Sequence, residues 1–517
     1  MTRVVTRDGD HEVASEHERH WRGRAAAFVV GGIPALAFPE PSVWPLAYVG
    51  LIPLLLMLRA APARREAAVR AWLGGTGFLL ATHHWLLPNV TVFLPLLALA
   101  LGALWIPWGW AAHALLGGRV TRGASAGAVV VLAGGWVLIE VIRAWEYLGG
   151  PFGLLGGSQW NNIPMLSAAS IGGVWLVGYV VVGVNVASVV AIAARDLQAR
   201  AIALGVAALL GALGPLYYLL DPGPEGGRTV RIAVVQPGVT RGPDVRFNRG
   251  EELTRTAIGG DVDLVVWGES SVGFDLDERP DLRTRLEELA VAAEADVLVS
   301  VDARSTRGGI YKSSVLVGPD GIESRYDKMR LVPFGEYIPL RPVLGWVAGL
   351  TEAAREDRSR GMSLNLFTGP GFHFGPLVCF ESAFPDLART FALMGADMII
   401  VQSATSTFQE SWAPETHASL AALRAVETGR PVLHSTLTGV TAAFDANGRR
   451  HLWLATDRSG ARFIEMPLAS RRTPYLVFGD WVVYLSLATV IGAGFLLRRR
   501  IRPDVGGSLD PQRHSPQ

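Results

Sequence analysis

The sequence predicts a membrane-embedded bundle of about eight helices that carries one α/β layered domain. Half of the 517 residues are hydrophobic and only 18% are charged, with a mean hydropathy of +0.29. Soluble domains usually contain about 25% charged residues. The apolar residues are also grouped, because long apolar runs fill residues 25–220, whereas residues 228–472 alternate short β-branched runs with charged segments of helical period. A membrane part and an α/β part follow from these two textures.

The apolar runs have lengths that suit transmembrane helices, which need ~20 residues to cross about 30 Å of hydrocarbon. The candidate spans are residues 25–38, 41–58, 69–87, 91–116, 125–145, 166–194, 201–220 and 481–497. The first is short, but it continues through Pro39-Glu40-Pro41 into the next run without a small-residue cleavage site. We therefore interpret it as a span and not as a cleavable signal peptide.

Basic residues precede the first span and follow the second, fourth, sixth and eighth. They are Arg3, Arg7, Arg19, Arg22 and Arg24; Arg59, Arg64, Arg65 and Arg70; Arg119 and Arg122; Arg195 and Arg200; and the cluster at 498–502. The positive-inside rule assigns these loops to the cytoplasm. Because the α/β domain lies between the seventh and eighth spans, we expect it outside the cytoplasm and both termini inside.

This pattern predicts five segments. They are a cytoplasmic N-terminal segment (1–24), a seven-span bundle (25–220), an extracytoplasmic domain (228–472), a final transmembrane helix (480–497) and a basic, disordered cytoplasmic tail (498–517).

The extracytoplasmic domain opens with a β-branched run at residues 229–236. Later apolar runs of strand length occur at 263–267, 296–301, 313–317, 374–380 and 397–402. Between them lie segments of helical period, such as 282–295 with Leu286, Leu289 and Ala293 on one face. Buried strands that alternate with helices predict an α/β layered fold.

Three chemically distinctive residues occur in the domain in the order Glu269, Lys328, Cys379, and both Glu269 and Cys379 stand at the end of an apolar run. A cysteine is only a few per cent thiolate at neutral pH, so a carboxylate that takes its proton activates it. A lysine ammonium can then stabilise the oxyanion of a tetrahedral intermediate. Each residue alone is as well explained by a helix cap, a solvated surface or a buried core cysteine. Their order, with Glu336 and Glu381 nearby, favours a nucleophilic site.

Other residues carry weaker signals. The single cysteine excludes an intramolecular disulfide and a Cys-based metal site, and His417 and His434 lack ligand spacing, so we expect no metal and no cofactor. His83 and His84 within the third span are either functional or hydrogen-bonded between helices. The apolar loop 344–350 either dips toward the membrane or packs internally. A net charge of +1 gives no reason to expect a nucleic-acid partner.

The Glu–Lys–Cys order resembles the nitrilase (carbon–nitrogen hydrolase) superfamily. More closely, the chain is similar to the membrane-bound branch of that superfamily, the apolipoprotein N-acyltransferases. The similarity lies in the bundle and in three segments, Lys328–Pro339, Cys379–Glu381 and Ala421–Thr441, the last of which contains Arg424-Ala-Val-Glu427 and Arg430-Pro431.

This resemblance implies a four-layer α-β-β-α sandwich. It implies Cys379 as nucleophile, Glu269 as general base and Lys328 as the oxyanion-stabilising cation, with Glu336, Glu381 and Phe380 as supporting residues of the pocket. The implied reaction moves an acyl chain from a phospholipid, through a Cys379 thioester, to the amine of a diacylglyceryl-cysteine lipoprotein. The implied location is the bacterial inner membrane.

Some segments depart from the family pattern. Residues 403–408 read Ser-Ala-Thr-Ser-Thr-Phe in place of Ser-Asn-Asp-Ala-Trp-Phe, Phe380 stands where Tyr is common, and Leu437-Thr-Gly439 replaces Asn-Asn-Gly. We expect altered substrate choice or lid behaviour. Two alternatives stay open: a membrane-tethered amide or nitrile hydrolase, and a scaffold that partners an envelope glycosyltransferase, a polyprenol-phosphate mannosyltransferase. Lysophospholipid release and the effect of Cys379→Ala separate these readings.

Overall fold

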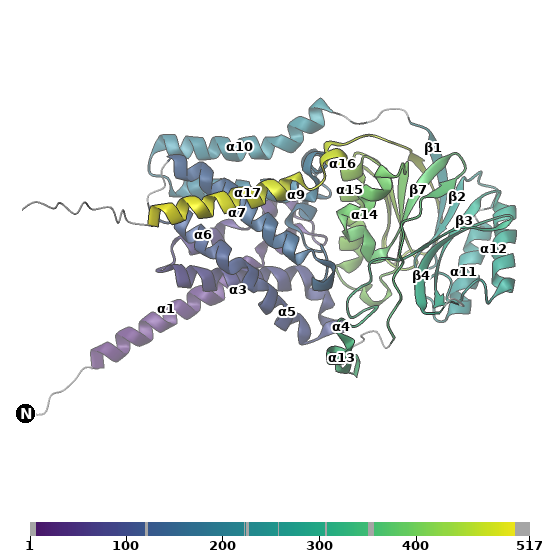
Figure 1. Ribbon diagram of the computed structural model, residues 1–517, viewed down its shortest axis with the longest axis horizontal. Coiled ribbons are helices and arrows are strands. Elements are labelled where there is room, and N and C mark those ends of the chain that lie inside the picture. Colours follow the sequence, from purple (N-terminus) through teal and green to yellow (C-terminus); the bar gives the residue numbers. More distant parts are fainter. Residues whose placement is uncertain are drawn as a thin grey trace, which may run out of the picture.

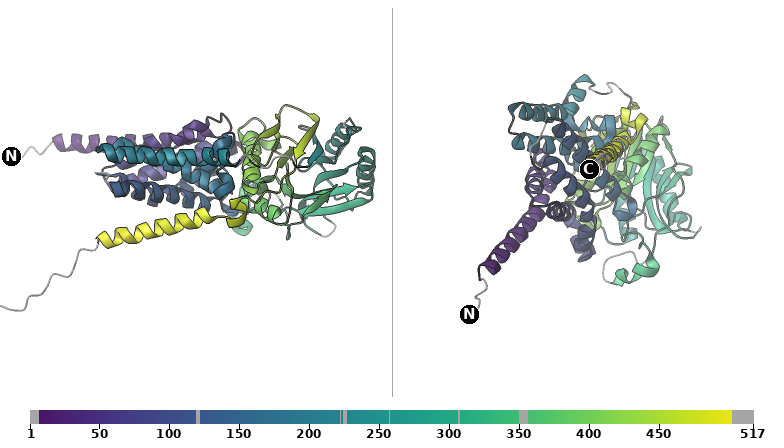
Figure 2. Two further views of the ribbon diagram at one scale, coloured as in Figure 1. Left: turned by 90° about the horizontal axis from the view of Figure 1, so that it is seen from above. Right: turned by 60° about the vertical axis from the view of Figure 1, so that its left-hand side comes forward.

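The computed structural model describes residues 7–118, 122–221, 223, 227–256, 258–305, 308–349 and 356–501. The molecule is elongated, with a helical bundle at one end and an α/β domain at the other (Figure 1). The described ends, the start of α1 and the end of α17, lie at the end of the bundle that faces away from the α/β domain (Figure 2). Arg3, Arg119 and most of the tail predicted to be disordered (residues 502–517) lie outside the described residues.

The bundle is built from helices that run side by side (Figure 2). They are α1 (Arg7–Gly31), α2 (Ile52–Arg59), α3 (Arg64–His83), α4 (Leu87–Val90), α5 (Phe93–Gly102), α6 (Ile106–Leu116), α7 (Arg122–Arg143), α8 (Ile163–Leu166), α9 (Ala169–Ala193), α10 (Leu197–Leu220) and α17 (Trp481–Ile501). Helix α3 packs against α1, α5 and α6, and α9 packs against α7 and α10. Helix α17 returns from the α/β domain to pack on α7.

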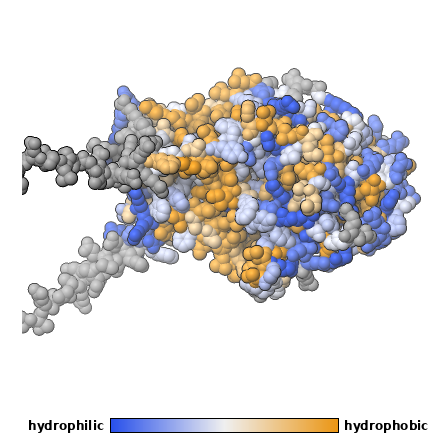
Figure 3. Space-filling model, in the orientation of Figure 1, coloured by the Kyte–Doolittle hydropathy of each residue, from blue (hydrophilic) through white to orange (hydrophobic). Residues whose placement is uncertain are grey.

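Among the described residues, four helical stretches are long and apolar enough to cross a membrane. They are Phe93–Leu116, Ala126–Arg143, Ala169–Ala193 and Leu197–Leu220. Hydrophobic side chains cover much of the bundle surface, whereas the α/β domain is mostly hydrophilic (Figure 3). Helix α10, for example, leaves Leu209 70% and Leu219 74% exposed. Side chains of this kind are stable in contact with lipid.

The predicted count of eight spans is not confirmed. The apolar helices Trp44–Arg59 and Trp481–Phe495 are shorter than a span, and α1 ends at Gly31, before a 3₁₀ turn, η1 (Ile33–Ala37). Pro34 lies in this turn and Pro45 in the next one, η2 (Trp44–Tyr48). Proline has no N–H to donate and clashes with the preceding turn, so α-helix does not continue through these residues.

The α/β domain contains two six-stranded sheets that face each other. The first has the order β12-β1-β2-β3-β4-β5 and the second has the order β11-β10-β9-β8-β7-β6. The strands are β1 (Thr229–Gln236), β2 (Leu264–Trp267), β3 (Asp296–Arg304), β4 (Ile310–Gly318), β5 (Gly321–Asp327), β6 (Phe367–Gly369), β7 (Phe372–Val378), β8 (Met398–Ser403), β9 (Val432–Thr436), β10 (Thr441–Phe444), β11 (Arg450–Leu454) and β12 (Gly460–Pro467).

Helices cover the outer face of each sheet, so the domain is an α-β-β-α sandwich, as the resemblance implied (Figure 1). The first sheet is covered by α11 (Pro243–Thr256) and α12 (Pro280–Ala293). The second is covered by α14 (Pro385–Leu393) and α15 (Ala413–Thr428), which lie between the sheet and the bundle (Figure 1). Strand β1 is apolar on both faces, which explains why both are covered. Ile232 and Val234 lie in the core between the sheets, whereas Ala233 and Val235 pack under α11 and α12.

The strand runs read from the sequence match the structure closely, with one correction. The run 229–236 coincides with β1, but the run 374–380 does not end where expected, because β7 stops at Val378. Cys379 has a φ of +51°, which takes the backbone out of the sheet and into a 3₁₀ turn, η8 (Cys379–Ala383).

The bundle and the domain are joined by direct contacts to α15. The backbone N–H of Val174 in α9 donates to Glu427 Oε1 at 2.8 Å, and the Thr416 hydroxyl donates to the carbonyl of Pro39 at 2.6 Å. Thr416 and Glu427 are buried. The helical layer of the α/β domain that contains α15 is therefore packed against the bundle.

Candidate active site

Cys379 occupies a strained position immediately after β7. A non-glycine residue at φ +51° lies in the left-handed region, which side chains rarely adopt unless the surroundings enforce it. Strands β7 and β8 are parallel, so Cys379 stands at the carboxyl end of a parallel pair, where side chains from different elements converge. Glu269 similarly follows β2, at the end of the first sheet.

Glu381, two residues after Cys379, fixes this turn. Its Oε2 accepts the backbone N–H of Val378 at 2.9 Å. Its Oε1 accepts the hydroxyl of Tyr326 at 2.7 Å and the backbone N–H of Met329 at 2.8 Å. Since Glu381 is fully buried, these bonds are protected from water. They tie the Cys379 turn to the segment that carries Lys328.

Two lysines and two carboxylates form a compact cluster beside Cys379, in which Lys328, Glu269 and Glu336 are buried and Lys312 is half-buried. Nζ of Lys312, on β4, lies 2.8 Å from Oε1 of Glu269 and 3.2 Å from Oε1 of Glu336. Nζ of Lys328 lies 2.8 Å from Oε1 of Glu336 and 3.6 Å from Oε1 of Glu269. Each charge therefore faces two of the opposite sign.

The cluster sets the protonation of its members. Burial alone would lower the pKa of Lys312 and of Lys328, but Glu269 and Glu336 raise both above the ordinary lysine value. Burial alone would raise the pKa of Glu336, but the two ammonium groups hold it below the ordinary value. Both lysines and Glu336 are consequently charged at neutral pH.

The thiol of Cys379 is protonated at neutral pH. Burial and the charge of Glu269 raise the pKa of Cys379 to about 12, against the opposing effect of Lys328 and Lys312. A thiol with such a pKa is a poor nucleophile until a base removes its proton. Glu269 is a carboxylate whose charge already acts on the thiol, so the arrangement is suited to proton transfer when a substrate arrives.

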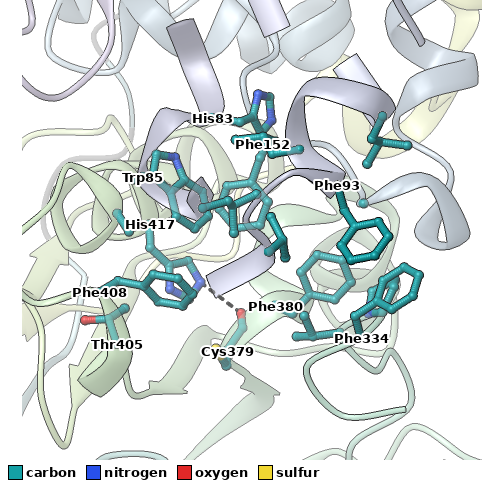
Figure 4. A pocket seen from close by; sticks show the side chains of 18 of the residues that line it. His83, Trp85, Phe93, Phe152, Phe334, Cys379, Phe380, Thr405, Phe408 and His417 are labelled. Carbon is teal, nitrogen blue, oxygen red and sulfur yellow. Dashed lines mark hydrogen bonds between the residues drawn. The ribbon is translucent and has the colours of Figure 1, made fainter. Parts of the chain in front are cut away.

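An apolar cavity of about 520 Å³ opens from Cys379 toward the bundle (Figure 4). Its walls come from the bundle segments around α4 and α5 and from loops of the α/β domain. The lining residues include Trp85, Leu86, Val90, Phe93, Leu94, Leu96, Leu97, Phe152, Phe334, Trp346, Phe380, Phe408 and His417. The cavity therefore extends from the Cys379 thiol to the helical bundle.

A second cavity of about 760 Å³ does not include Cys379. It lies between the end of α7 and the start of α14, and both Arg330 and Asp386 line it. Phe380 lines the first cavity and Phe384 the second, and their ring centroids are 4.9 Å apart. Of these two cavities, the apolar one is lined by Cys379.

Both parts of the chain match known protein families. Residues 30–187 match the apolipoprotein N-acyltransferase N-terminal domain, and residues 231–472 match the carbon-nitrogen hydrolase family. The apolipoprotein N-acyltransferase of Geobacter metallireducens is 29% identical over 497 residues, which cover 91% of this chain and 94% of that protein. The chain belongs to the apolipoprotein N-acyltransferase family. The enzyme of that name from Pseudomonas paraeruginosa is 28% identical over 502 residues, covering 93% of this chain and 97% of that one.

Two solved structures are each similar to about half of the chain. A CN-hydrolase superfamily protein from Xanthomonas campestris is 20% identical, with a TM-score of 0.37, covering 49% of this chain and 98% of that chain. An amidase from Nesterenkonia sp. is 18% identical, with a TM-score of 0.39, covering 51% of this chain and 98% of that one.

Membership of the apolipoprotein N-acyltransferase family, together with the four apolar helices, makes the chain a membrane protein. The segment that departs from the family pattern is part of the apolar cavity, since Ala404, Thr405 and Phe408 line it. Phe380, a second departure, lines the same cavity and stacks on Phe152 with ring centroids 6.1 Å apart. The third departure, Leu437-Thr-Gly439, is not among the lining residues.

The apolar loop at 344–350 reaches the same cavity. Its described part contains η7 (Gly345–Gly349), in which Trp346 is 58% exposed and packs on Phe93 of α5, with ring centroids 5.9 Å apart. Leu350 lies outside the described residues. Of the two histidines at the end of α3, His83 lines the cavity, whereas His84 packs on Trp412, with ring centroids 4.5 Å apart.

The structure brings together all six residues expected at the site, and it adds two that the motifs did not indicate. Lys312 completes the charge cluster, and His417 contacts the backbone of Cys379. The sequence did contain a signal for Lys312, because this lysine directly precedes the apolar run 313–317. Lysine is almost never buried unless it is paired with an opposite charge. Among the residues that the structure describes, no group of three or more His, Cys, Asp or Glu could hold a metal ion.

Proposed function

We propose that this family member transfers an acyl chain from a phospholipid to the free amine of a diacylglyceryl-cysteine lipoprotein. Apolipoprotein N-acyltransferases match the chain over more than nine-tenths of its length. The observation that carries the proposal is the position of Cys379, between a buried charge cluster and an apolar cavity that leads to the bundle. A small water-soluble amide substrate would not need an apolar cavity of this size.

In the first step, Glu269 accepts the proton of the Cys379 thiol as sulfur attacks the ester carbonyl of the phospholipid. The resulting oxyanion is stabilised by Lys328 and by the backbone N–H that follows the nucleophile. When the intermediate collapses, the bond from carbon to the glycerol oxygen breaks, and Glu269 returns the proton to that oxygen. The products are a Cys379 thioester and a lysophospholipid.

In the second step, the uncharged α-amine of the lipoprotein attacks the thioester carbon. Glu269 removes a proton from the attacking nitrogen, and the bond from carbon to sulfur breaks. The proton then returns to Cys379, which regenerates the thiol. The product is an amide, so the donor and the acceptor use one site in turn, as a ping-pong mechanism requires.

Glu336, Glu381 and Phe380 support these steps without exchanging protons. Glu336 accepts a hydrogen bond from Lys328 and faces Lys312, so it holds both ammonium groups in place. Glu381 fixes the Cys379 turn. Phe380 forms part of the wall beside the thioester.

The proposal includes eight spans in a bacterial inner membrane, with both termini in the cytoplasm and residues 228–472 outside it. The segments are those predicted from the sequence: 1–24, 25–220, 228–472, 480–497 and 498–517. The alternation of basic loops supports this topology. So does the direction of α1 and α17, whose described ends lie far from the α/β domain (Figure 2).

Two alternatives carry less support. A hydrolase would use the same cluster with water as the second acceptor, but the apolar cavity favours a lipid donor. A glycosyltransferase partner has no support from the family matches, and it forms no part of the proposal.

Intact mass spectrometry of the purified protein after incubation with phospholipid tests the thioester step. We expect an added acyl mass that hydroxylamine removes, together with lysophospholipid, and neither from Cys379→Ala. Folded protein that gives no adduct and no lysophospholipid would contradict the proposal.

A further inference from the structure

His417 of α15 lies against the Cys379 turn (Figure 4). Its Nε2 is 3.0 Å from the carbonyl oxygen of Cys379, the contact drawn as a dashed line, and 2.9 Å from Oγ of Ser382. On the other side of the ring, Nδ1 is 3.1 Å from Oγ of Ser403 at the end of β8. The side chain is 4% exposed. The imidazole is therefore held on both sides.

The contact with the Cys379 carbonyl requires one tautomer of the ring. A backbone carbonyl can only accept a hydrogen bond, so we assign the proton to Nε2, where the Ser382 hydroxyl oxygen accepts it as well. Nδ1 then carries the lone pair and accepts the hydroxyl proton of Ser403. Burial lowers the pKa of His417 to about 4, although the Cys379 carbonyl and the charge of Glu269 oppose this effect. The ring is thus neutral at neutral pH, with Nε2 as donor.

The hydrogen bond has a consequence for the amide that follows. The carbonyl of Cys379 and the N–H of Phe380 belong to one peptide unit, which is planar and trans, so they point in opposite directions. A donor that holds the carbonyl on the α15 side directs the N–H of Phe380 away from α15. Without that donor, the peptide unit of a residue at φ +51° would be less constrained.

We propose that His417 is a positioning residue: it orients the peptide between Cys379 and Phe380 so that the Phe380 N–H donates to the oxyanion formed at Cys379. This inference rests on the acyl-transfer function proposed above and assigns a role to a residue outside the three catalytic ones. His417 exchanges no proton with substrate. It acts on the rate of every step that passes through a tetrahedral intermediate.

Two reactions of Cys379 separate positioning from general support of the fold. Acylation by p-nitrophenyl butyrate passes through an oxyanion, and the burst of nitrophenolate measures it. Alkylation by iodoacetamide is a direct displacement and forms no oxyanion. Loss of one oxyanion donor slows a reaction by about a hundredfold to a thousandfold. Since His417→Ala misdirects this donor without removing it, we expect the burst to slow by on the order of tenfold to a hundredfold, while alkylation changes less than about twofold.

Conservative variants test the contact itself. The amide Nε2 of His417→Gln can occupy the place of the imidazole Nε2, so we expect it to restore most of the acylation rate. His417→Asn is too short to reach the Cys379 carbonyl and should remain slow. His434 is a matched control, because it is a buried imidazole 4.9 Å from the ring of His417 that bonds to the carbonyl of Val440. His434→Ala should leave the ratio of the two rates unchanged.

Three outcomes would overturn the inference. They are a wild-type burst rate in His417→Ala, an equal loss of acylation and alkylation in that variant, and equal rates in the Gln and Asn variants. A wild-type burst with the ester but no acylation from phospholipid would contradict the proposed function alone, and the His417 variants would still decide the role of this residue.

Discussion

Nζ of Lys312 lies 2.8 Å from Oε1 of Glu269, the carboxylate that the proposed mechanism uses as its base. The same ammonium group lies 3.8 Å from Asp302 Oδ2. Glu269 is therefore held by two lysines and not by Lys328 alone. Lys312, a residue of strand β4, is therefore in direct contact with the base of the proposed mechanism.

Lys312→Met keeps the apolar stem and removes the charge. The variant leaves Glu269 with one ammonium group, at 3.6 Å, and the cluster with an excess of buried negative charge. We expect slower acylation, by on the order of tenfold to a hundredfold, and a lower melting temperature. Lys312→Arg, which keeps the charge, should lose less. A Met variant that acylates at the wild-type rate would exclude Lys312 from the mechanism.

The protonated thiol predicts the pH dependence of Cys379 alkylation. The pKa of Cys379 is raised to about 12, so its thiolate fraction rises with pH far beyond the ordinary thiol range. We expect the iodoacetamide rate of the folded protein to increase steadily from about pH 7 to about pH 10 without a plateau. Unfolded protein should instead level off above about pH 8.5. A plateau at neutral pH in the folded protein would indicate a thiolate–lysine ion pair.

Substitution of Gly150 tests the role of the Phe380 ring beside Cys379. A Cβ at this position would lie 2.7 Å from Cζ of Phe380, whereas a Cβ at Gly149 would meet no atom within 4 Å. Both glycines have positive φ, +74° and +101°, so alanine brings backbone strain at either site. We expect Gly150→Ala to lower the acylation rate more than Gly149→Ala does, at matched expression. Gly149 itself lines the apolar cavity, so equal effects would show that displacement of Phe380 adds nothing to backbone strain and cavity filling.

Cavity length should decide which acyl chains are used. Leu94 of α5 is 5% exposed and lines the apolar cavity, whereas Leu99 on the same helix is 39% exposed and does not line it. Leu94→Trp fills part of the cavity, so we expect a preference for dioctanoyl over dipalmitoyl phosphatidylglycerol, measured by competition. Leu99→Trp should keep the wild-type preference. An unchanged preference in Leu94→Trp would place the acyl chain elsewhere.

Much of the α/β domain could be predicted from the sequence, because strands that are buried on both faces consist of continuous apolar runs. The run 229–236 became β1, and Leu286 and Leu289 face the sheet from α12 as expected. The apolar run extends through Cys379 and therefore predicts a strand there. The structure instead has a left-handed backbone at Cys379, held by contacts of Glu381 with Tyr326 and Met329 and by His417, all of them distant in the sequence.

The sequence motifs predicted the site residues that lie within them, but not those outside. Glu269, Lys328 and Cys379 were singled out by their order and their flanking residues, and the structure places them around one cluster. Lys312 and His417 were missed as site residues because each acts through a contact across the fold, between β4 and β2 and between α15 and η8. In the bundle, hydropathy alone predicted continuous spans at 25–38 and 41–58. The structure has 3₁₀ turns at Pro34 and Pro45 within these runs.

Transfer of an acyl chain to a lipoprotein amine can be measured by supplying both substrates together. The purified protein is incubated with a phospholipid that carries a labelled acyl chain and with a synthetic diacylglyceryl-cysteine peptide, beside Cys379→Ala and beside a peptide whose amine is acetylated. We predict that the label moves to the free-amine peptide in a hydroxylamine-stable amide, with one lysophospholipid for each peptide modified and no transfer in either control. Release of labelled fatty acid with the peptide unmodified would contradict the account and identify a hydrolase.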